Sequence, residues 1–322
     1  MKAVGLLSGG LDSTLAVKLL QEQGIEVIGV TFRSPFFDAE RGQKAARQLE
    51  IPLRVVDITD ELIPLIRSPK YGHGSGMNPC IDCHALMLRR AGQVMEAEGA
   101  SFLFTGEVLG QRPFSQTRRA LRLVEKESGY EGLVLRPLSA KLLPETVPER
   151  RGWVDRERLL DIRGRGRKRQ TELAKRYGIR DFPSPAGGCL LTDPVYARRL
   201  KDLLDHQGEI TRRDLELLRI GRHLRISTYT KAVVGRNQGE NRALEKLSLP
   251  EDLLMEVEGY PGPLLLIPKG GRKEDWGRAA GICLRYSDAP PHSPGRVRCR
   301  GRREGTVETM PLSPEECEGL LL

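Results

Sequence analysis

The chain opens with a short apolar segment that leads into a glycine-rich loop. Residues 3–7 read Ala-Val-Gly-Leu-Leu, and residues 8–13 read Ser-Gly-Gly-Leu-Asp-Ser. Beyond the loop, leucines recur at helical spacing as far as Gly24, where a helix would stop. A strand that turns through two glycines into a helix is typical of α/β sheets, so this opening restricts the fold more than any other feature.

Strand-like and helix-like segments go on alternating through the first half. Strands are predicted at 27–32, 53–56 and 102–105, with helical stretches at 38–49 and 84–98. The alternation predicts a parallel sheet with helices on both faces, in which ligands bind beyond the carboxyl ends of the strands. The residues at those ends are Ser8, Phe32, Asp57 and Thr105.

The loop after the first strand has the composition of an anion-binding site. Gly9 and Gly10 let the backbone approach a phosphate closely, and the following helix points its unpaired N–H groups there. Ser8 and Ser13 add hydroxyl donors, while Asp12 suits Mg²⁺ or substrate orientation. No Gly-Lys-Ser/Thr follows, so this is not the Walker loop. It resembles the signature of PP-loop ATP pyrophosphatases, which attach AMP to a substrate oxygen; the alternative is a purely structural glycine turn.

Three further blocks resemble the tRNA 4-thiouridine synthetase family. They are Thr105-Gly106-Glu107-Val108-Leu109-Gly110-Gln111 with Ser115-Gln116-Thr117, then Leu135-Arg136-Pro137-Leu138 with Lys141, and Cys83 followed by Met87 and Arg89. The resemblance covers residues 1–150 and implies an ATP site. Phe32, Thr105, Gly106 and Gln111 are expected to contact the nucleotide. Lys141 would neutralise charge on the α-phosphate, and its alternative role is that of a surface lysine.

Three cysteines form a separate pattern. Cys80 and Cys83 make a Cys-x-x-Cys pair after Asn78-Pro79, and Cys189 follows Ser184-Pro185-Ala186-Gly187-Gly188. Without an export signal, these should be reduced thiols. The pattern resembles the iron–sulfur tRNA thiolases, such as the 2-thiocytidine and 2-thiothymidine enzymes. That resemblance implies that the three thiolates hold a [4Fe–4S] cluster whose remaining iron carries the reacting sulfide.

Other uses of these thiols stay open. Cys283 or Cys299 would close the cluster if either supplied a fourth ligand. A persulfide mechanism requires only two of the three cysteines. A structural zinc site would need His84 or His73 to complete four ligands. The remaining alternative is that these thiols are inert and take part in no chemistry.

A basic surplus points to a polyanionic partner. The formal charge is +9, and residues 151–178 hold ten Arg or Lys against four Asp or Glu. Arginine side chains bind phosphate oxygens well, so we expect tRNA contact here, with a solvated helix start as the alternative. The residues expected to contact RNA in this segment are Arg163, Arg165, Arg167, Lys168 and Arg169.

The pattern changes in the last third of the chain. Residues 194–219 read as helices, and short strands at 224–226, 231–236 and 264–268 predict a small α+β domain from about residue 216. Three blocks resemble an NFACT-type RNA-binding domain, in which Arg222 and Arg236 would contact RNA. They are Gly221-Arg222-His223, Gly235-Arg236-Asn237 with Glu240-Asn241, and Tyr286-Ser287-Asp288. The alternative is a structural domain with ordinary surface arginines.

These features predict four segments. Residues 1–184 form a parallel-sheet PP-loop domain of the adenine nucleotide α-hydrolase-like class, and residues 185–215 form a helical connector carrying Cys189. Residues 216–300 form the NFACT-like domain, and residues 301–322 are a tail without recognised chemistry.

The predicted function is that of a tRNA sulfurtransferase using ATP, Mg²⁺ and a [4Fe–4S] cluster, with sulfide or a cysteine desulfurase as sulfur donor. The alternatives are an ATP-dependent amidoligase acting on a small molecule and a non-catalytic RNA-binding protein. No apolar run is long enough for a signal peptide or a membrane span, so we expect a cytoplasmic protein without membrane partners.

Overall fold

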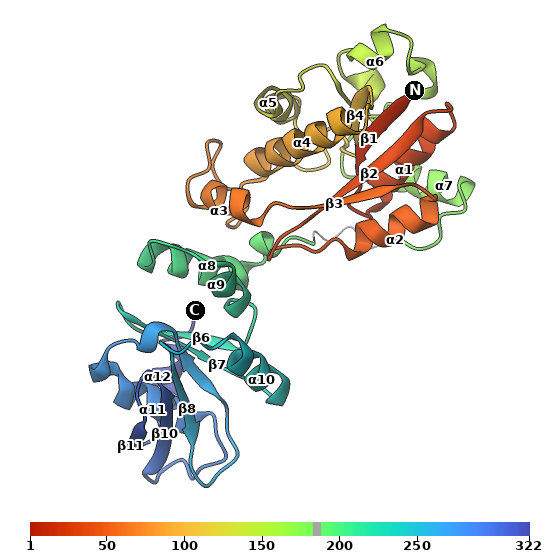
Figure 1. Cartoon of the computed structure of the whole chain (residues 1–322). Helices are drawn as coiled ribbons and strands as arrows, with labels where there is room; N and C mark the ends of the chain where they lie inside the picture. Colours follow the sequence, from red (N-terminus) through yellow and green to blue (C-terminus); the bar gives the residue numbers. More distant parts are fainter. Residues whose placement is uncertain (183–187) are drawn as a thin grey trace. The chain divides into compact units, whose positions relative to one another are not determined.

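The computed structural model describes residues 1–182 and 188–322, which form two compact units (Figure 1). The first unit is Met1–Thr192 and the second is Asp193–Leu322. The boundary expected between residues 184 and 185, and the Ser184 to Gly187 stretch before the third cysteine, lie outside the described residues. Cys189 belongs to the first unit, whereas residues 193–215 of the expected connector belong to the second.

The first unit is built on a five-stranded sheet in the order β3-β2-β1-β4-β5, and every pairing in it is parallel. In chain order the strands are β1 (Lys2–Leu6), β2 (Glu26–Arg33), β3 (Leu53–Asp57), β4 (Phe102–Thr105) and β5 (Val134–Leu135). The predicted α/β class with a parallel sheet is confirmed. The edge strand β5 was not predicted, because two residues carry no readable periodicity.

Helices cover both faces of this sheet (Figure 1). Apolar residues of α1 and α2 pack with Ala3, Val27 and Phe102 in one core cluster, while α4 packs against β1, β4 and α5. The helices are α1 (Leu11–Gln21), α2 (Glu40–Leu49), α3 (Thr59–Arg67), α4 (Cys80–Ala97), α5 (Arg118–Ser128), α6 (Val147–Arg150) and α7 (Lys168–Arg176). Short 3₁₀ turns lie at Ala140–Leu142, Arg156–Arg158 and Leu190–Thr192.

The strand order reverses between β1 and β4. The chain first builds outward from β1 through β2 to β3, then returns to place β4 on the other side of β1. Such a switch point leaves a crevice beyond the carboxyl ends of the two central strands, where ligands of open α/β sheets bind. The glycine loop (residues 8–13) follows β1 here, and Gly106 follows β4.

The second unit contains a six-stranded sheet in the order β11-β10-β8-β9-β7-β6, with all pairings antiparallel. Its strands are β6 (Arg222–Ser227), β7 (Thr230–Val234), β8 (Leu253–Val257), β9 (Leu265–Ile267), β10 (Gly295–Gly301) and β11 (Gly305–Thr309). Its helices are α8 (Pro194–His206), α9 (Arg212–Leu217), α10 (Gln238–Leu247), α11 (Trp276–Arg285) and α12 (Pro314–Glu318), with 3₁₀ turns at Pro268–Gly270 and Lys273–Asp275. Residues 301–322, expected as a tail, supply β11 and α12, and Cys317 of α12 is buried in this unit's core.

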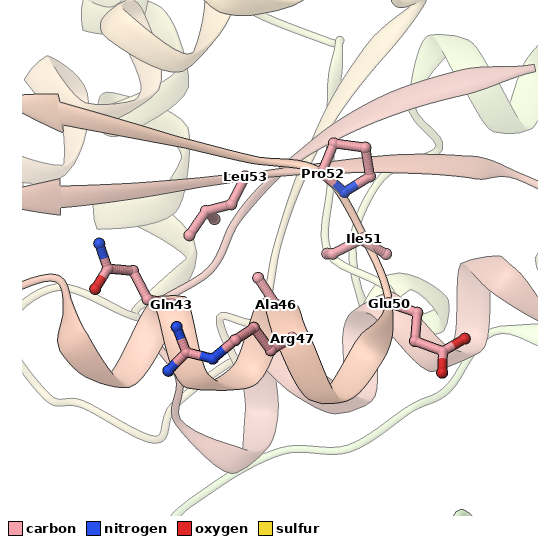
Figure 2. A pocket seen from close by; sticks show the side chains of 7 residues that line it. All are labelled: Gln43, Ala46, Arg47, Glu50, Ile51, Pro52 and Leu53. Carbon is pink, nitrogen blue, oxygen red and sulfur yellow. The ribbon is translucent and has the colours of Figure 1, made fainter.

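A surface hollow of about 580 Å³ lies between the last turns of α2 and the start of β3 (Figure 2). Its lining residues are Gln43, Ala46, Arg47, Glu50, Ile51, Pro52 and Leu53. The start of β3 is at the amino edge of the parallel sheet, so this hollow lies at the opposite edge from the glycine loop. Separately, none of the helices in the described residues is long and apolar enough to cross a membrane.

Candidate functional site

The shape of the glycine loop depends on Gly9. Its φ of +73° falls in the left-handed region that favours glycine. A Cβ at this position would lie 2.7 Å from the Cβ of Arg41 and would also meet the Arg41 backbone. Gly10 is the N-cap of α1 and has no side chain to cap it, so the N–H groups at the positive end of this helix are available to an anion.

The two serines of the loop face each other across it. Their Oγ atoms are 3.3 Å apart. Ser8 Oγ accepts a hydrogen bond from the Gly10 N–H (3.3 Å), and Ser13 Oγ donates to the Gly10 carbonyl (2.9 Å). These bonds hold both hydroxyls beside the helix N-terminus, where they can donate to a bound phosphate once they rotate.

Asp12 joins the loop to the segment after β4. Gln111 Nε2 donates to Asp12 Oδ2 at 3.1 Å, while Oδ1 is buried with no hydrogen-bond partner among the described residues. Gly106 permits this approach, because a Cβ there would lie 2.5 Å from the Cα of Ser13 and 2.6 Å from the carbonyl carbon of Asp12. A buried carboxylate oxygen without a donor is a candidate ligand for Mg²⁺.

Glu107 is the centre of a buried polar network directly behind this segment. Thr105 Oγ1 and Arg136 Nε each donate to its Oε2 at 3.0 Å, and His84 Nδ1 lies 3.0 Å from its Oε1. Burial alone would raise the pKa of Glu107, but the Arg136 charge and the His84 hydrogen bond outweigh it and lower that pKa from 4.5 to about 2. The network therefore holds an ionised carboxylate between the strand ends and α4, the helix that carries two of the cysteines.

Replacing Arg136 by methionine is expected to lower the free energy of unfolding by about 3–5 kcal/mol at pH 7, because it leaves the Glu107 charge buried without its partner. The matched control is Arg90→Met. Arg90 pairs with Glu61 at 3.7 Å on the surface, and its loss should cost no more than about 1 kcal/mol. Urea unfolding of both variants measures the difference, and equal losses would contradict the buried network.

The same network makes the free energy of unfolding of the wild-type protein sensitive to acid. The folded-state pKa of Glu107 is below its ordinary value, so the stabilisation is present above about pH 4.5 and is lost as the pH falls towards 2. Unfolding followed across this window should therefore show Glu107→Gln losing less stability on acidification than the wild type.

Cys80 and Cys83 lie one turn apart at the start of α4. Asn78 Nδ2 donates to Cys80 Sγ at 3.0 Å, and the Asn78 side chain is held in turn because its Oδ1 accepts from the Gly76 N–H at 2.9 Å. Asp82, between the two cysteines, is buried and accepts from the backbone N–H groups of residues 70 and 71 at 3.1 and 3.2 Å. The loop before α4 is thereby fixed around the Cys-x-x-Cys pair.

Cys189 reaches this pair from a separate loop. The Leu190 N–H donates to the Phe36 carbonyl after β2 (3.0 Å), and the Met77 N–H donates to the Leu191 carbonyl (3.0 Å). These two bonds tie residues 190–191 to the carboxyl edge of the sheet and to the loop before Cys80. The tertiary structure therefore brings together the three cysteines that the sequence singled out.

The three thiols influence one another electrostatically. Burial raises the pKa of the Cys83 thiol, and the nearby Cys189 and Cys80 raise it further. Burial also raises the pKa of Cys189 to about 11, with Cys80 raising it and a Leu191 backbone hydrogen bond and Arg112 lowering it. Even so, no group of three or more Cys, His, Asp or Glu side chains in the described part of the chain is arranged to hold one metal ion.

A structural zinc site would need four ligands around one ion. The two histidines that might complete such a site have other partners: His84 has Glu107, and His73 Nε2 lies 2.8 Å from the Ile66 carbonyl. The described residues thus give the zinc alternative no support.

Two arginines connect the cysteines with the glycine loop. The backbone of Arg41 packs under Gly9, while its Nη1 would lie 3.4 Å from a Cβ at Gly188, directly before Cys189. Arg112 is near enough to Cys189 to lower its pKa and follows Gln111, the partner of Asp12. The anion-binding loop and the three thiols therefore occupy neighbouring parts of one site.

Two predicted nucleotide contacts lie elsewhere around this site. Phe32 is buried in β2, one strand from the loop. Lys141 follows β5, and its Nζ donates to the carbonyl and Oε2 of Glu157 at 2.8 and 2.9 Å. Lys141 is thus engaged with Glu157, and the contact expected between it and the α-phosphate stays a prediction.

The basic run at residues 163–169 lies beside the first turn of α1. Residues 109 and 163 form a parallel bridge next to Gln111, and α7, which begins within this run, packs on α1. The Nε of Arg167 and both amide atoms of fully buried Gln170 lack hydrogen-bond partners among the described residues. Arg169 pairs with Asp161 (2.7 Å), whereas Arg163 and Arg165 are exposed.

In the second unit, the three blocks that resemble an RNA-binding domain converge. A Cβ on Gly221 would meet the Val234 backbone, next to Gly235. Asn241 Oδ1 accepts from the Leu264 N–H at 3.1 Å, and Arg222 lies 4.7 Å from the ring centroid of Tyr286. Of the two arginines expected to contact RNA, Arg236 is paired with Glu240.

Sequence reasoning missed several residues of this site. Glu107 and Arg136 lie within the blocks 105–111 and 135–138, and Asn78 lies two residues before Cys80, so their positions inside these motifs are the signal that could have identified them. Arg41 and Arg112 carry no local signal, because their proximity to the third cysteine depends on three separate loops meeting.

Comparison with known families divides the chain in the same way as the structure does. Residues 1–141 match the family described as thiamine biosynthesis protein (ThiI), and residues 221–320 match the NFACT protein RNA binding domain. The resemblances predicted for the two ends of the chain, to a PP-loop tRNA thiolation family and to an NFACT-type domain, are therefore confirmed.

Curated relatives align with parts of the chain. The tRNA-specific 2-thiouridylase MnmA of Xanthobacter autotrophicus is 27% identical over 266 residues, which cover 74% of this chain and 63% of that protein. The MnmA of Syntrophomonas wolfei is 39% identical over 90 residues, 26% of each. A probable tRNA sulfurtransferase of Methanosarcina mazei is 34% identical over 124 residues, 34% of this chain and 29% of that protein. The chain thus spans less than two thirds of the length of these relatives.

Among solved structures, a 4-thiouridine synthetase–RNA complex with bound ATP is 29% identical to this chain. The match covers 43% of this chain and 37% of that one, with a TM-score of 0.34.

Proposed function

We propose that this protein is an ATP-dependent tRNA sulfurtransferase that replaces a pyrimidine carbonyl oxygen with sulfur. The observation that carries the proposal is the convergence of Cys80, Cys83 and Cys189 beside an anion-binding loop at the carboxyl edge of a parallel sheet. An amidoligase or an RNA-binding protein without catalytic activity would have no use for three convergent thiols. The curated relatives, which are named for tRNA sulfur insertion, support the same reaction class.

The first step is activation of the base. Ser8, Gly9, Gly10 and Ser13 bind the ATP phosphates through hydroxyls and helix N–H groups. Asp12 holds Mg²⁺ through the oxygen that lacks a donor. The pyrimidine oxygen attacks the α-phosphorus, pyrophosphate leaves, and the ring N–H proton is released. Phe32, Thr105, Gly106 and Gln111 position the nucleotide, and Lys141 would have to leave Glu157 to reach the α-phosphate.

The second step exchanges oxygen for sulfur. Hydrosulfide attacks the activated ring carbon, the carbon–oxygen bond breaks, and AMP leaves with the oxygen. The proton from sulfur passes to the ring nitrogen, so the overall change consumes one ATP and one hydrosulfide and releases AMP and pyrophosphate. No oxidation occurs, and the step requires only that the sulfur donor supply sulfide.

The three thiols suit a [4Fe–4S] cluster better than a single metal ion. In a cluster each thiolate binds a different iron, so the sulfurs need not surround one point. When bound, the cluster supplies an iron without a protein ligand, at which sulfide can be held. The protein places Cys80 and Cys83 by α4, fixes Cys80 through Asn78, and holds Cys189 through the backbone bonds of residues 190 and 191. Within the described residues no fourth cysteine joins them, because Cys283, Cys299 and Cys317 are buried in the second unit's core.

RNA binding is assigned to two places. Arg163, Arg165, Arg167, Lys168 and Arg169 lie beside the glycine loop and suit phosphates near the target base. In the second unit, Arg222 and Arg236 suit contacts to another part of the tRNA, consistent with the RNA-binding family that this unit matches.

The test combines metal analysis with turnover. Protein purified without oxygen is assayed for iron and acid-labile sulfide, then incubated with tRNA, sulfide, Mg²⁺ and ATP. Pyrophosphate is measured, and digested tRNA is analysed by mass spectrometry for thionucleosides. We expect about four irons per chain and sulfur insertion that stops when a non-cleavable α,β-methylene ATP analogue replaces ATP.

Two negative results separate the parts of the proposal. No iron after anaerobic reconstitution, with thiolation intact, would leave persulfide transfer between the same cysteines, followed by reduction of the resulting disulfide by an external thiol. Pyrophosphate release stimulated by a small metabolite and not by tRNA would overturn the proposed reaction and favour the amidoligase class.

A further inference from the structure

A second basic surface, outside the segments singled out in the sequence, lies along α5 and the loop before it. Its members are all exposed: Arg112, Arg118, Arg119, Arg122 and Lys126. We call this set the arginine surface. None of its side chains forms an ion pair with a carboxylate in the described residues, unlike exposed Arg54, which pairs with Glu98, and Lys70, which pairs with Glu127.

The acidic residues of α5 cannot neutralise the arginine surface, because they already have partners on its packed side. Glu125 pairs with buried Arg136 and accepts from the Gly132 N–H at 3.2 Å. Glu127 accepts from Lys70 at 2.8 Å and from the Tyr71 hydroxyl at 2.7 Å. The outer face of the helix is therefore left with uncompensated positive charge.

The first turn of α5 places this charge where it is least favourable. Thr117 caps the helix by accepting from the Ala120 N–H, and Arg118 and Arg119 follow immediately, with no acidic residue in that turn. Cations at the positive end of a helix dipole are disfavoured. A bound anion would offset both the repulsion between the arginines and the unfavourable interaction with the helix.

The arginine surface adjoins both chemical parts of the site. Arg112 comes directly after Gln111, which binds Asp12 of the glycine loop, and α5 packs on α4, the helix that carries Cys80 and Cys83. A short loop, closed by a hydrogen bond from the Gly110 N–H to the Gln116 carbonyl at 2.7 Å, leads from there to the start of α5. A polyanion lying along α5 would therefore pass the cysteines and the glycine loop.

We propose that the arginine surface holds the sugar–phosphate backbone of the tRNA strand that carries the target nucleotide. The helix is 11 residues long, or about 16 Å at 1.5 Å per residue, so its cations span several successive phosphates and not one isolated anion. This inference rests on the proposed function and adds a contact surface that sequence reasoning did not assign.

The test is the triple variant Arg118→Gln, Arg119→Gln, Arg122→Gln. Glutamine keeps the helix propensity of arginine, and unchanged circular dichroism would verify folding. The matched control is Lys18→Gln, Arg47→Gln, Arg54→Gln, which removes three charges from the last turns of α1 and α2 and from the start of β3. Binding of an unmodified tRNA transcript is measured by fluorescence anisotropy from 50 to 300 mM KCl.

The arginine-surface variant should bind tRNA about 10- to 100-fold more weakly, and its plot of log K against log salt should be shallower by about 2. The control should lose markedly less affinity. Equal affinity and slope for wild type and the arginine-surface variant would overturn this inference while leaving the sulfurtransferase proposal in place. If the wild-type protein itself neither bound nor thiolated tRNA, the proposed function would fail.

Discussion

Alanine in place of Cys189 is expected to abolish sulfur insertion into tRNA while pyrophosphate release continues. In the proposed cluster mechanism the second step needs all three thiols, so loss of one should lower the thiolation rate by about 1,000-fold or more. The first step is proposed to depend on the glycine loop (residues 8–13), to which Cys189 does not belong. Thionucleoside yield and pyrophosphate release, measured in the same reaction, separate the two steps.

The control for this variant is Cys317→Ala. Cys317 is a buried thiol of the second unit, so its loss tests whether removal of any buried cysteine disturbs the enzyme. Its thiolation rate should stay within about threefold of the wild type, because only a small side chain is lost, from the core of a unit that holds none of the three convergent cysteines. Full thiolation by Cys189→Ala would disprove the three-thiol site, and two-thiol chemistry through Cys80 and Cys83 would replace it.

Alanine at Gly106 is expected to stop the first step. Its Cβ would lie 2.5 Å from the Cα of Ser13, so the glycine loop and the segment after β4 would have to separate. That separation breaks the placement of Asp12 against Gln111 and moves the phosphate donors. A displacement of about 1 Å at a reacting centre costs about 100-fold in rate. Pyrophosphate release with saturating tRNA measures this loss.

Gly208→Ala is the matched control. Gly208 has no atom within 4 Å of its would-be Cβ, and its φ lies outside the left-handed region, so the same added methyl group should leave the rate unchanged. Urea unfolding of both variants verifies that they are folded at the assay temperature. A folded Gly106→Ala protein with wild-type pyrophosphate release would show that the close approach of the two segments is dispensable.

The fold of the first unit was largely readable from local patterns. The apolar run before the glycine loop, the leucines of α1 and the strands at 27–32, 53–56 and 102–105 all carry their periodicity within a few residues. The short β5 was not predicted, because two residues are too few to show a hydrophobic periodicity. Likewise, β11 and α12 were not predicted, because their residues read as a charged, Pro- and Gly-rich tail. Their order depends on the pairing of β11 with β10 and on the packing of Cys317 into the core.

The sequence by itself determined the chemistry that this protein can offer: an anion-binding turn, a Cys-x-x-Cys pair and a third cysteine beyond a glycine pair. Local composition suffices for such features, because each is written in consecutive residues. Only the tertiary structure decided that Cys189 joins Cys80 and Cys83, that Arg136 keeps Glu107 ionised, and that the arginines of α5 adjoin the site. Those relations depend on backbone hydrogen bonds and packing between distant segments, and no local pattern encodes them.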